Sequence, residues 1–391
     1  MLLQIVKKIT IFARLFNSNE PLPAKATKSL IMNSLHNRVN KDVLKARLMA
    51  DQTPRVTLSF YQYYHLRNPQ IFRDHFYILL SEVEVLGRIY VSYEGVNAQV
   101  SVPQHQVEAF KEAMQTITFL QDIRLNFAIE DDGKSFFKLI IKVREKIVAD
   151  GLDDHTFDVT NKGIHLKAEE FNALADNEET IIIDMRNHYE SEVGYFQNAV
   201  LPDVETFREA LPVVEEMLSD KKNKNIIMYC TGGIRCEKAS AYYKHKGFKN
   251  LYQLEGGIIE YARRATELGI ENKFIGKNFV FDERLGERIS PDVIAKCHQC
   301  GEACDHHINC ANDACHILFL QCTSCSQKYE NTCSIKCQEF NRLSDDIKES
   351  LRKTETFNGT KFGKGRYKAH HKDHSLEEKR NANVLQNIIQ S

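Results

Sequence analysis

The sequence predicts a mixed α+β and α/β protein with two folded domains and a cysteine-rich C-terminal segment. Its 391 residues are enough for two or three domains of about 100–200 residues each. Apolar residues follow one order of strand and helix patterns before residue 150 and a different order after residue 158. The first cysteine is Cys230, and nine of the eleven cysteines lie between residues 297 and 337.

The composition is that of a globular protein, with 42% hydrophobic and 27% charged residues. It excludes a collagen, a coiled coil and a chain that is disordered throughout. The formal net charge of −1 argues against a protein that coats nucleic acid by bulk charge, although a local basic path is compatible with it. No run approaches the ~18–20 apolar residues of a membrane-spanning helix. Clustered cysteines favour thiol chemistry and metal binding over a disulfide scaffold, so we expect a soluble, cytoplasmic protein.

Residues 32–150 are expected to form a ferredoxin-like α+β domain. The alternating segment 56–61 predicts a half-buried strand, and apolar residues at helical spacing over 69–86 predict a helix. Further elements follow in the order strand, strand, helix, strand, strand, at 87–92, 96–102, 103–114, 123–129 and 137–143. This order predicts the fold but gives no function by itself.

Residues 158–272 are expected to form an α/β domain, because strands that alternate with helices imply a parallel sheet. Segments 180–184 and 225–229 are continuous apolar strands of the kind that a sheet buries on both faces. Asp184 ends the first strand, and a six-residue loop follows the second, before a helix over 236–245. The loop residues are Cys230, Thr231, Gly232, Gly233, Ile234 and Arg235.

This loop has the properties of an anion cradle around a sulfur atom. Gly232 and Gly233 let successive N–H groups face inward, and the following helix adds its positive end. Together with the charge of Arg235, these features should lower the pKa of Cys230 below the ~8.5 of a free cysteine. A buried structural cysteine beside a glycine turn is the alternative. The C-x4-R spacing at a strand-to-helix junction favours a reactive thiolate.

Two further residues, Asp184 and Cys236, are expected to support the loop. Asp184 is expected to order the loop or cap a backbone group rather than to transfer protons. Cys236 lies in the first turn of the helix. It either shares the lowered pKa and forms a disulfide with Cys230 or resolves a persulfide, or it is only a small residue packed at the helix start.

The cysteine-rich segment, residues 273–340, is expected to bind metal. Its two C-x2-C pairs are separated by 21 residues, which approximates a zinc ribbon or knuckle. The candidate ligands are Cys297, Cys300, Cys322 and Cys325. Nine cysteines and the interspersed histidines could supply two sites. Structural zinc is the prediction, and an iron–sulfur cluster or plain reduced thiols are the alternatives.

Both ends of the chain differ from its middle. Residues 1–31 combine an apolar helical stripe with basic residues, which is typical of a targeting peptide, an interfacial helix or an upstream extension; we favour an extension, with Met32 as the working start. Residues 341–391 are expected to be a mobile basic tail, because the stretch 352–380 has few apolar residues.

The loop 230–235 resembles the active-site loop of rhodanese domains, in which the first cysteine carries a persulfide. Related phosphatases have a loop one residue longer. Tyr195 differs from the family, since many rhodaneses have a histidine there. The other segments that resemble the rhodanese pattern are Asp184–Arg186 with Glu190, Gly194 and Ala199, and the glycine turn Leu254–Gly257.

A wider resemblance covers about residues 32–340 and is to the bacterial tRNA uridine(34) hydroxylases, the TrhO or YceA-like family of rhodanese-domain proteins. It implies oxygen-dependent 5-hydroxylation of uridine at the wobble position, with O2 as co-substrate and Cys230 as the catalytic residue. The implied partner is the anticodon region of tRNA. The reaction also needs an electron donor, which the sequence does not identify. The matching segments are 35–38 (LHNR), 94–99 (EGVNAQ), 131–136 (DDGKSF), 184–190 (DMRNHYE), 230–240 and 276–282 (GKNFVFD).

Two other functions stay open from the residues alone. One is a sulfurtransferase that passes persulfide sulfur to a partner, which thiosulfate turnover would favour. The other is an RNA-binding protein whose loop only senses redox state, which retained modification in a Cys230→Ser strain would favour. No nucleotide-cofactor fingerprint appears in the sequence. Aromatic residues that could stack on a splayed base are Tyr61, Tyr63, Tyr64 and His65.

Overall fold

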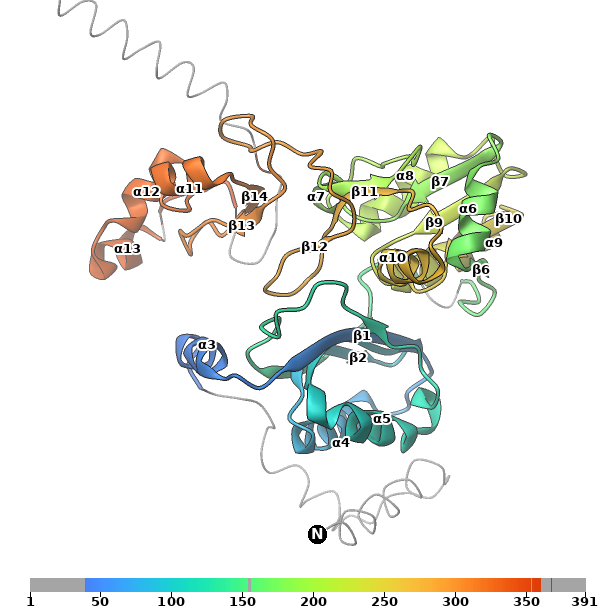
Figure 1. The fold of residues 1–391 in the computed structure, drawn as a ribbon, viewed down its shortest axis with the longest axis horizontal. Coiled ribbons are helices and arrows are strands. Elements are labelled where there is room, and N and C mark those ends of the chain that lie inside the picture. The colour runs from blue at the N-terminus through green and yellow to red at the C-terminus, as the bar shows by residue number, and fades with distance from the viewer. Residues whose placement is uncertain (1–38, 154–155, 353, 360–366, 368–391) are drawn as a thin grey trace, which may run out of the picture.

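The structure is a computed structural model and describes residues 39–153, 156–352, 354–359 and 367 (Figure 1). The extension expected over residues 1–31 and most of the basic stretch 352–380 lie outside the described residues. In the described part of the chain, no helix is both long enough and apolar enough to cross a membrane.

The first domain has the predicted ferredoxin-like order of strands and helices. It contains a five-stranded sheet in the order β4-β1-β3-β2-β5, in which β5 adds to the edge and runs parallel to β2. A short helix, α3 (Lys41–Ala50), precedes it. The elements are β1 (Arg55–Tyr63), α4 (Pro69–Glu82), β2 (Leu86–Ser92), β3 (Gly95–Pro103), α5 (Val107–Gln115), β4 (Asn126–Phe127) and β5 (Leu139–Val143).

Three boundaries differ from the prediction. The helix expected over 69–86 ends at Glu82, because Glu84 has a positive φ of 54° and the chain then turns into β2. Pro103 is the last residue of β3 rather than the start of a helix, and a 3-10 turn separates it from α5. The strand expected over 123–129 is only the two-residue β4.

The two faces of this sheet have different chemistry, because side chains alternate along a strand. Leu58 and Phe60 of β1 are buried in the core beneath α4 and α5, which cover one face of the sheet. Thr57, Ser59 and Tyr61 point to the opposite face, which is turned toward the second domain (Figure 1). The sheet therefore presents a polar surface to its neighbour.

The second domain contains the expected parallel sheet, with strand order β6-β10-β9-β7. Apolar clusters fill both of its faces, as continuous apolar strands require. The strands are β6 (Ile164–Leu166), β7 (Thr180–Asp184), β9 (Asn225–Tyr229) and β10 (Asn250–Leu254). The helices are α6 (Ala168–Ala175), α7 (His188–Ser191), α8 (Phe207–Met217), α9 (Ile234–His245) and α10 (Gly257–Leu268).

A small three-stranded sheet connects the second domain to the rest of the chain. Its strands are β8 (Gly194–Phe196), β11 (Phe274–Asn278) and β12 (Glu287–Arg288), in the order β12-β11-β8. The segment between β11 and β12 reaches the first domain, where the Glu283 N–H donates to the Ser135 carbonyl at 3.2 Å and the Ile129 N–H donates to Glu287 Oε1 at 3.3 Å. This segment therefore joins the two domains at one end of their interface.

The cysteine-rich segment is a small lobe of short elements. They are the hairpin β13 (His307–Asn309) and β14 (Leu318–Leu320) and the helices α11 (Thr323–Tyr329), α12 (Ile335–Asn341) and α13 (Asp345–Leu351). Helix α13 lies in the stretch that the sequence assigns to a mobile tail. Ser344 occupies its N-cap position, and Asp345 and Asp346 in its first turn favour a helix despite the absence of a buried face.

Candidate functional site

The loop after β9 surrounds the sulfur atom of Cys230. Helix α9 begins at Ile234, two residues earlier than expected, because Gly233 has a φ of 99° and forms the N-cap. The Gly233 N–H donates to Cys230 Sγ at 3.2 Å. The thiol therefore lies at the amino end of a helix and accepts a backbone hydrogen bond, as an anion cradle requires.

The glycine turn before α10 supports the same loop. The Ile258 N–H donates to the Cys230 carbonyl at 3.1 Å, and the Ile259 N–H donates to the Thr231 carbonyl at 3.3 Å. Gly257 has a φ of 68°, and a Cβ there would lie 2.5 Å from both loop carbonyl oxygens. Only glycine therefore allows α10 to pack this closely against the loop.

The surroundings of Cys230 favour the thiolate. Burial alone would raise the pKa of this thiol, since only 1% of the residue is exposed. The Cys236 thiol, the Arg235 charge and the N–H groups of Arg235 and Cys236 together outweigh burial and lower its pKa from an ordinary 9.0 to about 6. Cys230 is therefore mostly ionised near neutral pH.

Cys236 does not share this lowered pKa. Burial, the hydrogen bond with the Cys230 sulfur and the negative charge of that sulfur raise the pKa of Cys236 well above its ordinary value. Cys236 thus stays protonated and donates its S–H to Cys230. Of the two alternatives for Cys236, a shared low pKa is therefore wrong, because one buried thiolate disfavours a second beside it.

Arg235 is held by an acidic partner that the residue-based reasoning did not assign. Arg235 Nη1 and Nη2 donate to Glu190 Oε2 and Oε1 at 2.6 and 2.8 Å. Thr231 lies against the same pair, with its hydroxyl 3.4 Å from Glu190 Oε1. Both members of the pair are buried, and Arg235 keeps the pKa of Glu190 lowered although burial opposes this. The pair fixes the two ends of the loop to α7.

Asp184 does not contact the loop 230–235, and its Oδ1 accepts the Arg186 N–H at 2.9 Å. Its carboxylate forms an ion pair with Arg186 at 2.7 Å and accepts the Tyr229 hydroxyl at 2.8 Å. Tyr229 immediately precedes Cys230. Asp184 therefore orders the end of β9 rather than contacting the loop backbone.

The polar face of the first domain contacts the loop from the other side. Asn126 Nδ2 donates to the Gly232 carbonyl at 3.5 Å. The Tyr61 hydroxyl donates to Glu237 Oε1 at 3.2 Å, and the Tyr63 hydroxyl donates to the Ile234 carbonyl at 3.4 Å. Two of the four candidate stacking residues are thus used to join the domains. Tyr64 stacks on Phe119 of its own domain, with ring centroids 4.5 Å apart.

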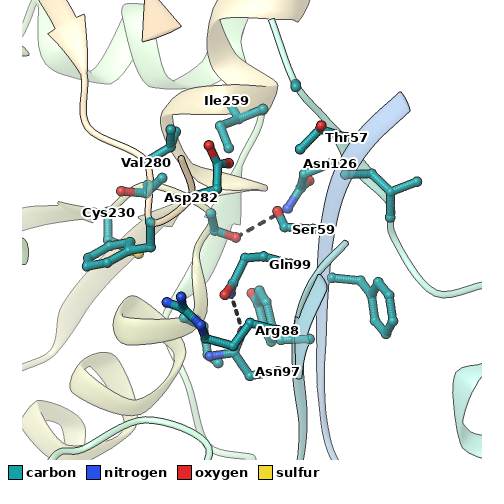
Figure 2. A pocket seen from close by; sticks show the side chains of 18 of the residues that line it. Thr57, Ser59, Arg88, Asn97, Gln99, Asn126, Cys230, Ile259, Val280 and Asp282 are labelled. Carbon is teal, nitrogen blue, oxygen red and sulfur yellow. Dashed lines mark hydrogen bonds between the residues drawn. The ribbon is translucent and has the colours of Figure 1, made fainter. Parts of the chain in front are cut away.

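A cavity of about 290 Å³ lies between this face and the loop. Figure 2 shows Cys230 on one side of it and the side chains of the sheet on the other. Its polar lining from the sheet comprises Thr57, Ser59, Tyr61, Arg88, Tyr90, Asn97, Gln99 and Asn126. Cys230, Thr231, Gly232, Ile234 and Arg235 line the opposite side, and Ile259, Val280 and Phe281 add apolar surface.

An acidic group that the sequence reasoning missed also lines this cavity. Glu287 is fully buried, and its Oε1 accepts from Ile129 N–H and from Arg284, which also pairs with Asp282. Within the described part of the chain, Glu287 Oε2 has no hydrogen-bond partner. Burial raises the pKa of Glu287, and the attraction of Arg284 opposes that shift only in part. No local pattern marks Glu287, because its environment depends on both domains.

The four candidate metal ligands lie together. The sulfur atoms of Cys297, Cys300, Cys322 and Cys325 are all within 4.8 Å of one another, and Cys300 is the exposed member. Cys300 Sγ and Cys322 Sγ are 3.6 Å apart, and the Cys322 N–H donates to Cys297 Sγ at 3.3 Å. Four thiols in this arrangement fit tetrahedral coordination of a soft divalent cation.

Comparisons with known proteins agree with this architecture. The profile of the UPF0176 acylphosphatase-like domain matches residues 55–147, that of the rhodanese-like domain matches 167–264, and that of the rhodanese C-terminal region matches 275–338. The tRNA uridine(34) hydroxylase of Photorhabdus laumondii is 53% identical over 359 residues, which are 91% of this chain and 100% of that protein. The chain belongs to the tRNA uridine(34) hydroxylase family.

Other members of the tRNA uridine(34) hydroxylase family are similarly close. The Pectobacterium atrosepticum protein is 58% identical, over 82% of this chain and 91% of its own length. The Sodalis glossinidius protein is also 58% identical, over 79% of this chain and 88% of its own length. Among solved structures, a rhodanese-like domain protein from Staphylococcus aureus is 25% identical over 25% of this chain and 90% of its own, with a TM-score of 0.21.

Proposed function

We propose that this chain hydroxylates C5 of the wobble uridine of tRNA, with O2 as co-substrate and Cys230 as the catalytic residue. The observation that carries the proposal is the cavity in which an acidic, buried thiol faces a wall of amide side chains from another domain. Relatives that share more than half of their residues with this chain bear the name tRNA uridine(34) hydroxylase. Since the substrate is tRNA, the proposal also places the protein in the cytoplasm.

The chemistry of the cavity fits a uracil base. Uracil presents two carbonyl oxygens and one N–H group along its edge, and amide side chains supply both donors and acceptors for such an edge. Asn97, Gln99 and Asn126 provide these amides on the sheet side (Figure 2). Ile259 and Val280 offer apolar surface for the faces of the ring. A base enters such a pocket only when it is splayed out of its stack, as anticodon bases can be.

Each residue of the loop has a role in this proposal. Cys230 acts as a thiolate that takes the sulfane sulfur of a donor such as thiosulfate, with sulfite as the leaving group, and so carries a persulfide. The backbone from Thr231 to Arg235 stabilises negative charge on the sulfur, and Cys236 donates a hydrogen bond to it. Arg235 braces the loop through Glu190, and Asp184 orders β9. Hydroxylation places one oxygen atom of O2 on C5 and reduces the other to water, so two electrons come from an external donor.

The proposal assigns separate tasks to the parts of the chain. Residues 32–150 form the wall that reads the base, residues 158–272 carry the thiolate, and the cysteine-rich segment, residues 273–340, contains the metal ligands of the lobe. In this lobe Cys297, Cys300, Cys322 and Cys325 bind one structural zinc ion, supported by the proximity of their sulfur atoms. The lobe and the basic tail 341–391 contact tRNA outside the anticodon base.

Sulfur transfer is the second candidate function, and the cradle around Cys230 favours it independently of tRNA. A thiolate with a pKa of about 6 accepts sulfane sulfur from thiosulfate and hands it to an acceptor thiol. Thiosulfate turnover by the purified chain that exceeds its rate of tRNA hydroxylation would favour this candidate.

The hydroxylase proposal is tested by growing a strain that lacks its own copy of this protein under 18O2, with and without the chain. Nucleoside mass spectrometry should detect 5-hydroxyuridine derivatives only when the chain is present, with 18O on the base. Unchanged 5-hydroxyuridine without the chain, or oxygen that comes from water, would contradict the proposal.

A further inference from the structure

A second group of four cysteines lies in the C-terminal lobe, apart from the candidate ligands predicted from the sequence. It consists of Cys310, Cys315, Cys333 and Cys337, whose sulfur atoms all lie within 4.8 Å of one another. Each of the four residues is at most 1% exposed. None of them forms a disulfide. This arrangement needs an explanation, because contact with three other thiols contributes little free energy to the burial of a thiol.

The spacing of these sulfur atoms matches tetrahedral coordination of one metal ion. Cys315 Sγ lies 3.6 Å from Cys333 Sγ, and Cys333 Sγ lies 3.6 Å from Cys337 Sγ. A Zn–S bond of ~2.3 Å in a tetrahedron places neighbouring sulfur atoms about 3.8 Å apart. A disulfide would need about 2.05 Å. Clusters with several iron atoms bind their cysteines through different irons and would hold these sulfurs farther apart.

Three of the four sulfur atoms accept hydrogen bonds from N–H groups. The Cys333 N–H donates to Cys310 Sγ, the Asn312 amide to Cys337 Sγ and the Gly359 N–H to Cys315 Sγ, each at 3.4 Å. Such donors stabilise negatively charged sulfur, and they are typical of the residues that surround thiolate ligands of a metal. Four thiolates at this spacing repel one another unless a cation lies between them.

The ligands come from two segments, as in structural zinc sites. Cys310 and Cys315 lie in the connection of the β13–β14 hairpin, and Cys333 and Cys337 lie at the start of α12. We propose that these four cysteines bind one structural zinc ion, in addition to the ion assigned to the first group. Because all four positions are filled by buried cysteines, this second site is closed and has no place for substrate.

The second site fastens the end of the described chain onto the lobe. Gly359 reaches it through Cys315, and the Tyr367 hydroxyl donates to the Cys333 carbonyl at 3.1 Å. Tyr367 also stacks on His298, with ring centroids 4.9 Å apart, and His298 Nε2 lies 2.7 Å from Glu192 Oε1 of the second domain. The ion therefore holds Gly359 and Tyr367, two residues of the basic tail, against the lobe.

Metal analysis of the full chain tests this inference. The protein should contain two zinc ions, and the double variant Cys310→Ser/Cys337→Ser should contain one. The matched variant Cys297→Ser/Cys325→Ser, which removes ligands of the first group, should also contain one. Full replacement by Co2+ should give the absorption of tetrahedral cobalt–thiolate sites at two equivalents. A wild-type content of one ion, unchanged in the Cys310→Ser/Cys337→Ser variant, would overturn the second site.

If a variant fails to fold, the zinc content of the wild-type protein tests the inference instead. Native mass spectrometry of the wild-type chain should show a mass increase of two zinc ions with all eleven cysteines reduced. Peptide mapping that finds a disulfide among the four cysteines, or a chain that retains no zinc ion, would contradict the inference. Either result leaves the hydroxylase proposal untouched, because the site lies outside the cavity.

Discussion

Glu190 accepts two hydrogen bonds from Arg235, at 2.6 and 2.8 Å, and so connects α7 to the last residue of the loop 230–235. The paired guanidinium is fixed rather than mobile, which suits a scaffold for the loop better than a ligand that swings toward substrate. The loop geometry around Cys230 depends on a carboxylate that lies 40 residues before it in the sequence.

Removal of this carboxylate should destabilise the fold. Glu190→Gln leaves the buried Arg235 charge without its partner, and such a loss costs about 3–5 kcal/mol. Urea unfolding of the second domain should show this decrease in the free energy of unfolding. Glu179→Gln, which breaks the exposed pair between Glu179 and Lys224, is the control and should show no measurable change. Equal stability of both variants would contradict the role of the Glu190 pair.

The acidity of Cys230 should be visible in its alkylation rate. Reaction with iodoacetamide should rise with pH through a midpoint of about 6 and be near its plateau at neutral pH. Cys236 should remain unreactive over the same range, because its pKa is raised. Peptide mass spectrometry after short pulses of iodoacetamide distinguishes modification of Cys230 from modification of Cys236. A midpoint near 9, as for an ordinary thiol, would contradict the cradle.

The same pKa shift predicts how stability depends on pH. The folded-state pKa of Cys230 lies below the unfolded value, so the unfolded chain binds more protons between about pH 6 and 9. The stabilisation from Cys230 ionisation should therefore be fully present above pH 9 and be lost as pH falls toward 6. The contribution of Cys230 is isolated by subtracting the pH dependence of the unfolding free energy of Cys230→Ser from that of the wild type. An identical pH dependence of the two proteins would show that Cys230 does not ionise in this way.

Gly257 should be intolerant of a side chain for a reason specific to the loop. A Cβ there meets the carbonyl oxygens of Cys230 and Thr231 at 2.5 Å. Gly257→Ala should shift the loop and slow Cys230 alkylation at neutral pH. Gly269→Ala is a matched control, because Gly269 has nearly the same φ, 64° against 68°, with no atom within 4 Å of its Cβ. The control should share the backbone strain but keep the alkylation rate.

Asn126 should contribute to substrate recognition. Asn126→Ala removes one donor and one acceptor from the cavity wall, and a lost hydrogen bond of this kind should raise KM for tRNA roughly 3- to 10-fold. Asn126 Nδ2 also donates to the Gly232 carbonyl of the loop at 3.5 Å, so the alkylation rate of Cys230 is measured alongside KM, and an unchanged rate assigns the change in KM to base reading. Asn250→Ala, at an exposed position outside the cavity, should leave KM unchanged. A fall in kcat with unchanged KM would contradict a binding role.

Most of the fold and of the cysteine loop could be predicted from short, local sequence patterns. The strand, the loop 230–235 and the helix after it are contiguous, so their sequence alone indicates the cradle. The ferredoxin-like order was also predictable, since each element shows its own periodicity. The short β4 was not, because it is defined by pairing with β1 rather than by its own residues.

The rest of the site depends on contacts between distant segments. Asn126 and Glu287 line the cavity only because the two domains meet there, and neither has a motif. The raised pKa of Cys236 follows from the charge of its neighbour, which spacing does not reveal. C-x2-C pairs mark the first metal group, whereas the second combines a C-x4-C and a C-x3-C pair that are less distinctive.

The most direct test of the central claim is nucleoside mass spectrometry of tRNA from a strain that lacks this protein, complemented with variants of the chain. Cys304→Ser is the matched control, because Cys304 is buried but lies outside the loop and outside both four-cysteine groups. The wild-type chain and Cys304→Ser should restore 5-hydroxyuridine derivatives, and Cys230→Ser should not. Full restoration by Cys230→Ser would show that the thiolate does not carry the reaction.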